Sequence, residues 1–157
     1  MQGKKSILDL LNQLLTGELT ASHQFIAHSK MSKNWGYQRL AEKMDAEAHD
    51  ELGHAGKYIE RILFLEGTPD LQSLQTLNIA TTVKGQFDND LVLEKEAVSR
   101  LNAGIELARK EGDNGTEALL TEILTSEESH VLWLETQLRM IQEIGLANYL
   151  AEQMKGS

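Results

Sequence analysis

The chain of 157 residues contains no cysteine and only one proline. Without cysteine it can form no disulfide framework, no thiolate metal site and no iron–sulfur cluster. The near absence of proline, with abundant Leu, Ala, Glu, Gln and Lys, favours an all-helical chain. No apolar stretch approaches ~18 residues, and the N-terminus lacks the apolar core and cleavage site of a signal peptide. We therefore expect a cytoplasmic protein without a membrane partner.

Positive charge is also scarce, since 15 Lys and Arg face 24 Asp and Glu, for a formal net charge of −9. This balance disfavours nucleic acid and anionic membranes as partners. The sequence contains no Gly-rich loop of the kind that cradles phosphate, and no low-complexity segment. An acidic surface suits the handling of cations, although many soluble acidic proteins have no such role. The length predicts a single domain, residues 1–157, with room for a real core.

Four long amphipathic stretches can be read from the spacing of apolar residues. Ser6 is the expected N-cap of the first, and Gly145 should end the fourth. A short terminal helix should follow this glycine. The expected helices run from about Ser6 to Asn34, Tyr37 to Phe64, Thr82 to Lys110, Thr116 to Ile144 and Leu146 to Gln153.

The connections predict the topology. The turns at 34–36 and 112–115 are short, so each should join two antiparallel helices into a hairpin. Between the hairpins lie about 16 residues, 66–81, with Gly67 and Pro69. A link of that length can cross the full length of a bundle. We expect an all-α four-helix bundle with a long crossover between the second and third helices and a short C-terminal helix.

Six residues follow one arithmetic pattern, in which a Glu precedes a Glu-x-x-His motif by 33 residues and the whole trio recurs 76 residues later. The i, i+3 spacing places both side chains of each motif on one helix face. All six fall on the apolar stripes, where ionised carboxylates are costly unless paired or metal-bound. For one glutamate alone, a solvent-facing position is the simpler interpretation. The six are Glu18, Glu51, His54, Glu94, Glu127 and His130.

Four carboxylates and two imidazoles converging between helices form a site for two divalent metals, as in ferritin-like di-iron and di-manganese bundles. Oxygen and nitrogen ligands without sulfur suit iron or manganese, and ligand type alone does not distinguish zinc. Glu51 and Glu127 can bridge, which leaves coordination positions open for oxygen or peroxide. Of the redox-active metals we favour iron, because two Fe(II) ions can supply two electrons to the oxidant.

The chain resembles bacterioferritins over essentially its full length. The resemblance lies in TGELTASHQF around Glu18, KNWG at the first turn, DELGHAGKYIERILFLEGTP, SEESHVLWLE and IGLANYL. It implies a cytoplasmic shell of about 24 subunits that oxidises Fe(II) with O2 or H2O2 and stores ferric mineral. It also implies two iron ions per subunit, with Glu51 and Glu127 bridging. The terminal ligands would be Glu18 and His54 on one iron, and Glu94 and His130 on the other.

Two positions depart from the bacterioferritin pattern. The family binds haem between two subunits through a Met directly after the first bridging Glu, and this position is Leu52. Leucine offers no lone pair, so we expect no haem b in the homo-oligomer. Many members carry a Tyr beside the di-iron site where this chain has Phe25. Tyr58 and Trp133 remain as oxidisable aromatic residues.

A second, apolar stripe on the second helix has two interpretations, a wide core face or a subunit interface. The resemblance favours the interface, and close backbone approach there would explain Gly53 and Gly56, as would neutral drift. The stripe consists of Ala41, Ala48, Leu52, Ala55 and Ile59.

The remaining polar residues allow further alternatives. Glu47 and Asp50 are candidates for an inner-surface iron site, and solvated acids are an equal alternative. His23, His28 and His49 match no partner, and most of them should lie at the surface. Two other functions stay open beside that of a ferroxidase. The chain could be mainly a structural subunit that co-assembles with a haem-binding relative, or another di-metal enzyme such as a manganese catalase or a hydroxylase.

Overall fold

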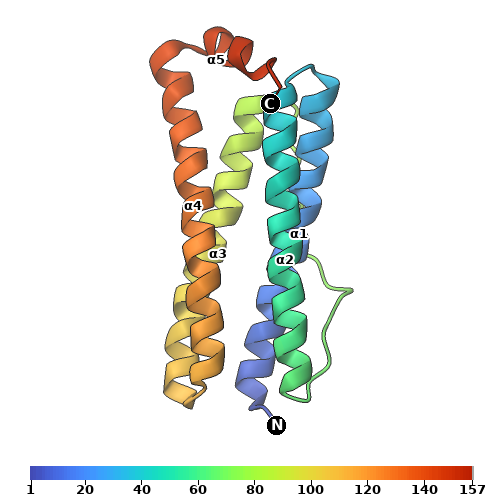
Figure 1. Ribbon diagram of the computed structural model, residues 1–157, viewed down its shortest axis with the longest axis vertical. Coiled ribbons are helices and arrows are strands. Elements are labelled where there is room, and N and C mark those ends of the chain that lie inside the picture. The colour runs from blue at the N-terminus through green and yellow to red at the C-terminus, as the bar shows by residue number, and fades with distance from the viewer. Residues whose placement is uncertain (157) are drawn as a thin grey trace.

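The computed structural model describes residues 1–156, and these form five α-helices and no strand (Figure 1). The first four helices make a bundle and the fifth lies across one of its ends. This confirms the expected all-α bundle with a short C-terminal helix. The helices are α1 (Lys5–Asn34), α2 (Gln38–Phe64), α3 (Val83–Glu111), α4 (Asn114–Ile144) and α5 (Leu146–Gln153).

The helix ends agree with the expected ones to within two residues, with one error in the capping. Ser6 is not the N-cap of α1, because this helix begins at Lys5 and its N-cap Lys4 makes no capping bond through its side chain. α4 begins at Asn114 rather than Thr116, since the Asp113 carboxylate accepts a hydrogen bond from the Thr116 N–H at 2.9 Å and caps the first turn.

The four helices form two hairpins joined by a long crossover, as expected. α1 packs mainly against α2, and α3 packs mainly against α4. Residues 65–82 lead from the end of α2 back to the opposite end of the bundle, where α3 begins (Figure 1). As a consequence α2 and α3 run in the same direction.

Side chains of α1 fix the crossover along its length. Asn12, Thr20, Gln24 and His28 lie on one face of α1 at spacings of eight, four and four residues. Each accepts a hydrogen bond from a crossover N–H, which gives an extended segment the partners that its backbone needs. The donors are Asp70 (2.8 Å), Gln75 (3.0 Å), Asn78 (3.1 Å) and Ala80 (3.3 Å) respectively.

His28 lies in the interior and is the exception to the expectation, which His23 and His49 meet, that most unmatched histidines lie at the surface. His23 and His49 are exposed, but His28 is 0% exposed. Its Nδ1 lies 2.9 Å from Asp90 Oδ1 on α3, and Gln24 donates to the same carboxylate at 2.8 Å. This buried group ties α1, α3 and the crossover together.

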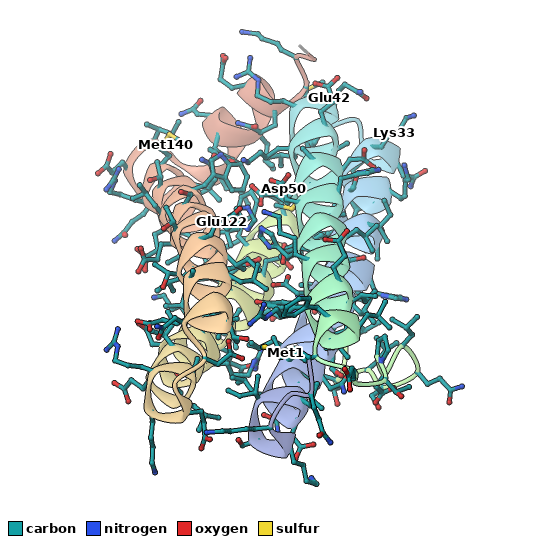
Figure 2. All side chains as sticks on the ribbon, turned by 60° about the horizontal axis from the view of Figure 1, so that its bottom comes forward. Met1, Lys33, Glu42, Asp50, Glu122 and Met140 are labelled. Atoms are coloured by element: carbon teal, nitrogen blue, oxygen red, sulfur yellow. The ribbon has the colours of Figure 1, made fainter. Side chains whose placement is uncertain are left out.

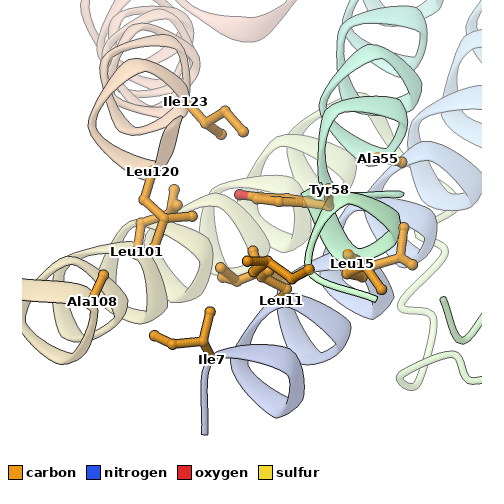
Figure 3. Close-up of a cluster of buried hydrophobic side chains, with 12 residues drawn as sticks. Ile7, Leu11, Leu15, Ala55, Tyr58, Leu101, Ala108, Leu120 and Ile123 are labelled. Carbon is orange, nitrogen blue, oxygen red and sulfur yellow. The ribbon is translucent and has the colours of Figure 1, made fainter. Parts of the chain in front are cut away.

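The core consists of three apolar clusters, with a polar band between the two larger ones toward the ends of the bundle. The smallest cluster contains Ala21, Phe25, Ala48 and Leu93. On each of α1 to α4 the candidate ligands stand between residues of different clusters. Figure 3 shows the first cluster, in which Tyr58 lies across the bundle with its hydroxyl end toward α4. The second cluster contains Leu40, Met44, Val83, Phe87, Leu134, Ile141 and Tyr149.

The apolar stripe on α2 is divided between core and surface. Ala41, Ala48 and Ala55 are buried within the subunit, so the core-face interpretation holds for them. Leu52 is 49% exposed and Ile59 is half-buried, which leaves only these two for a subunit interface. Apart from its neighbours in the chain and the backbone of its own helix, a Cβ added at Gly53 or Gly56 would meet no atom of the described chain within 4 Å.

Candidate metal centre

All six candidate ligands converge in the polar band, and none is more than 8% exposed. α1 supplies Glu18 and α3 supplies Glu94, one carboxylate each. α2 and α4 each supply a Glu-x-x-His pair, whose i, i+3 spacing turns both side chains toward the bundle axis. The structure therefore brings together residues that are up to 112 positions apart in the chain.

Three carboxylates surround the imidazole of His54. Its Nδ1 lies 3.0 Å from Glu127 Oε1 and 3.6 Å from Glu18 Oε1. Glu51 Oε2 lies 3.7 Å from the same nitrogen. These four residues place one ligand atom each within 4.8 Å of one another, which is close enough to enclose a metal ion.

The imidazole of His130 has equivalent surroundings. Its Nδ1 lies 2.9 Å from Glu51 Oε1, 3.5 Å from Glu127 Oε2 and 3.7 Å from Glu94 Oε1. The two imidazole rings stand 6.5 Å apart between centroids, at 24° to each other. A second group of four residues can thus enclose a second ion.

The two groups share Glu51 and Glu127, and each of these directs one oxygen toward each histidine. Glu18 approaches only His54, whereas Glu94 approaches only His130. This is the division expected of two bridging and two terminal carboxylates around a pair of cations.

Several buried polar atoms of the centre make no well-aligned hydrogen bond within residues 1–156, although some of them lie close to an oppositely charged group. They include both oxygens of Glu94, Glu51 Oε1, Glu127 Oε2 and His130 Nδ1. Buried groups of this kind are costly unless something satisfies them. A divalent cation on each side would take these lone pairs, so the donor set fits a metal pair.

The electrostatics of the ion-free centre follow from the burial of four carboxylates. Burial, followed by the neighbouring charge of Glu51, raises the pKa of Glu18 and of Glu94 well above the usual range. Burial opposes the charging of His54, but hydrogen bonds to Glu127, Glu18 and Glu51 outweigh it and raise the pKa of His54 to about 12. Protons thus partly neutralise the centre.

The other two shifts have the same origin. Burial lowers the pKa of His130, but hydrogen bonds to Glu127 and other carboxylates outweigh it and raise this pKa well above its usual value. Hydrogen bonds from Glu94, His130 and His54 lower the pKa of Glu127 against the effect of burial. Glu127 therefore stays ionised, surrounded by the hydrogen-bond donors Glu94, His130 and His54.

The far side of His130 carries further charged residues. Its Nε2 lies 2.6 Å from Glu47 Oε2 and 3.6 Å from Asp50 Oδ2. Glu47 is buried, whereas Asp50 is exposed on α2 (Figure 2). Glu47 Oε1 in turn pairs with Lys43 Nζ at 2.6 Å. Sequence reasoning missed this contact, although Glu47 precedes Glu51 and His54 by four and seven residues and so shares their face.

Aromatic residues border the centre on two sides. The Tyr58 hydroxyl is buried without a hydrogen-bond partner among the described residues, and burial together with the charges of Glu18 and Glu127 raises its pKa. Phe25 and Trp133 line a small cavity that also reaches Glu94 and His130. The Tyr58 phenol is thus held neutral beside the candidate ligands.

No helix within residues 1–156 is both long enough and apolar enough to cross a membrane.

Comparison with known proteins gives a consistent result. Residues 8–144 match the model of the ferritin-like domain. The chain is 43% identical over 152 residues to a bacterioferritin of Mycobacterium leprae, covering 97% of this chain and 96% of the relative. It is 43% identical over 155 residues to a bacterial ferritin of Synechocystis sp., covering 98% and 99%. With a bacterial ferritin of Paramagnetospirillum magnetotacticum the identity is 44% over 154 residues, covering 96% and 93%.

Proposed function

The chain belongs to the ferritin family, alongside the bacterioferritins that it matches, and on that premise we propose that it is an iron-storing ferroxidase. It oxidises Fe(II) to Fe(III) at the six-residue centre and deposits the product as ferric mineral. The mineral is held in a hollow cytoplasmic shell of about 24 subunits, the assembly that the resemblance to bacterioferritins implies.

The observation that supports this function best is the sharing of Glu51 and Glu127 between two ligand groups. A single shared carboxylate could arise in any buried acidic cluster. Two carboxylates that each direct one oxygen to each imidazole hold two cations at a fixed separation. The transfer of two electrons to an oxidant needs such a pair of iron ions, because each Fe(II) supplies one electron.

Each residue then has a definite role. Glu18 with His54, and Glu94 with His130, are the terminal ligands of the two iron ions, and the bridging carboxylates hold the two ions together. Two bound Fe(II) ions supply two electrons to O2 or H2O2. Carboxylic protons must leave before iron binds, since only the carboxylate and the neutral Nδ1 offer a lone pair. The apolar clusters above and below keep the ligands in place.

Outside the centre, Glu47 and Asp50 stay candidates for an iron site at the inner surface, supported by their approach to the far side of His130. Tyr58 and Trp133 are the oxidisable aromatic residues nearest to the chemistry, since Phe25 has no phenol.

The homo-oligomer should contain no haem b, because Leu52 offers iron no sulfur. Leu52 is half-exposed on α2, where a second subunit could cover it. The absence of sulfur at this exposed position favours a second candidate function. The chain could share its shell with a haem-binding bacterioferritin subunit and contribute the iron-oxidising centre.

The test removes one terminal ligand. Glu94→Ala should leave one iron without its terminal carboxylate, so that rapid oxidation of Fe(II), followed in the near ultraviolet, falls to near the protein-free rate. Glu96→Ala is the matched control, because Glu96 lies on the same helix with its side chain exposed. Oxidation by Glu94→Ala at the parent rate would refute the assignment of the centre.

A further inference from the structure

The two halves of the centre differ in the residue that stands four positions before each Glu-x-x-His motif. The 76-residue offset relates Glu18 to Glu94, and the Glu51 and His54 pair to Glu127 and His130. Glu47, which lies behind His130, stands four residues before Glu51. The same offset relates Glu47 to Ile123, which stands four residues before Glu127. An acid on one side therefore corresponds to a hydrocarbon on the other.

The surroundings of the two imidazoles differ in the same way. His130 turns Nδ1 to Glu51 at 2.9 Å, and its Nε2 lies 2.6 Å from Glu47 Oε2. His54 also turns Nδ1 to the centre, but within residues 1–156 no acceptor contacts its Nε2. Ile123 belongs to the apolar cluster beneath the centre and is 1% exposed.

Glu47 is held in place from its other side. Its buried carboxylate meets Lys43 Nζ at 2.6 Å through Oε1, which leaves Oε2 for His130. The Lys43 ammonium lies 5.1 Å from the centroid of the Trp133 ring, in the geometry of a cation–π contact. An exposed i, i+4 ion pair contributes little to stability, but here Glu47 is 5% exposed and its two oxygens face nitrogen atoms of Lys43 and His130. The Glu47 side chain therefore has little freedom to turn.

A histidine that binds a metal through Nδ1 carries its proton on Nε2. A carboxylate that accepts this proton fixes the tautomer and the orientation of the ring, and makes the ligand more basic. Glu47 Oε2, at 2.6 Å, is the acceptor closest to Nε2 of His130, and neither oxygen of this buried carboxylate makes a well-aligned hydrogen bond to another group of the described chain. Removal of such a partner lowers metal affinity by roughly 10–100-fold.

We propose that Glu47, held by Lys43, is a positioning residue for His130 and makes the two metal positions inequivalent. The position formed by Glu94 and His130 binds a divalent cation more tightly than the position formed by Glu18 and His54. This inference rests on the proposed function only in taking the six residues as metal ligands. The two positions consequently fill in sequence, and the His54 position is the one that exchanges its ion.

The experiment is an anaerobic titration of the purified full-length protein with Co(II), followed by visible absorption and by calorimetry. The parent should bind two Co(II) per subunit in two resolved steps. Glu47→Gln should weaken the tighter step by roughly 10–100-fold and leave the other step unchanged. Lys43→Met should weaken the same step by a smaller factor, because it frees the Glu47 carboxylate without removing it.

Two variants serve as controls. Lys43→Arg keeps the cation and should retain the parent pattern, a rescue that a purely steric role of Lys43 would not produce. Lys57→Met removes another lysine of α2, which pairs with Glu122 on α4, and should change neither step. Circular dichroism on each variant verifies that the helices are intact.

The remaining outcomes separate the two hypotheses. A parent that binds two Co(II), with both steps weakened equally or not at all in Glu47→Gln, overturns the positioning role alone. The alternative role of Glu47, as a ligand of an inner-surface iron site with Asp50, predicts instead a third Co(II) that the parent binds and Glu47→Gln loses, and that outcome also overturns the positioning role. A parent that does not bind two Co(II) overturns the proposed centre, and this inference with it.

Discussion

Glu51 Oε1 lies 2.9 Å from His130 Nδ1, although the two residues belong to different hairpins and stand 79 positions apart. The other oxygen of Glu51 lies 3.7 Å from His54, its neighbour on the same helix. One carboxylate therefore joins the two halves of the centre. The role of a bridging carboxylate, Glu51 or Glu127, can be separated from that of a terminal ligand by experiment.

Replacement of a bridging carboxylate should affect both metal positions. Glu127→Ala should lose the tight binding of both Co(II) ions, whereas Glu18→Ala should weaken chiefly the position at His54, because Glu18 approaches only that histidine. Equilibrium dialysis with metal analysis gives the number of ions bound per subunit. If Glu127→Ala and Glu18→Ala lose the same single ion, Glu127 is not a bridge.

Metal binding should release protons and should strengthen as the pH rises. Glu18 and Glu94 have raised pKa values, and the pKa of His54 is raised from about 6.5 to about 12, so these groups hold protons that a cation must displace. A weakly buffered solution with an indicator dye measures the release on addition of Zn(II). Binding without any proton release would contradict the electrostatics described for the centre.

The ion-free protein should lose stability toward alkaline pH. A group whose pKa is raised on folding stabilises the fold fully below its unfolded pKa, and that contribution is lost as the pH rises through the folded value. For His54 the window runs from about 6.5 to about 12. Glu127 has a lowered pKa, so its contribution to stability is lost only on acidification and does not change toward alkaline pH.

Melting temperatures of the ion-free protein test this sign. The melting temperature should fall between about pH 6 and about pH 9, and Zn(II) should raise it more at the higher pH. An increase in the melting temperature of the ion-free protein over this range would be the opposite of the expected result.

The purified homo-oligomer should bind no stoichiometric haem. Iron–thioether ligation needs sulfur at position 52, and Leu52 is close to methionine in volume, so the surface can persist without its ligand. Titration with haem should give no sharp Soret band of a bis-methionine complex, and Leu52→Met should produce one. A tight complex of the parent at near one haem per two subunits would refute this.

Position 52 also tests whether this face of α2 is covered by another subunit. Leu52→Arg should leave the subunit folded, because the side chain is 49% exposed, but should reduce the particle from a large shell to dimers or monomers. Ala55→Arg should instead destabilise the subunit itself by about 3–5 kcal/mol, since Ala55 lies in the core. Light scattering and circular dichroism separate the two effects. A monomeric parent would contradict the proposed shell.

The sequence predicted the helices and the six converging residues because both depend on local spacing. A helix fixes which residues share a face, and the 76-residue repeat supplied the pairing of the two halves. Ser6 failed as a cap because several positions near a helix start can satisfy the same pattern.

His28 and Glu47 could not be placed with the same certainty, because their partners come from elsewhere in the chain. His28 is buried by Asp90 on α3 and by the backbone of the crossover at Ala80. Glu47 shares the ligand face, but its approach to His130 depends on the distance between α2 and α4, which spacing along one helix does not give. The repeat also concealed the difference between Glu47 and Ile123, since it was defined by the ligands alone.

The number of Fe(II) ions oxidised in the fast phase tests the central claim most directly. Fe(II) is added anaerobically to the purified protein in increasing ratio, oxygen or peroxide is admitted, and the rapid rise in near-ultraviolet absorbance is measured. The amplitude should grow linearly and saturate at two Fe(II) per subunit, because four carboxylates and two histidines form two positions. Saturation at one, or no rapid phase with either oxidant, would contradict a two-iron centre.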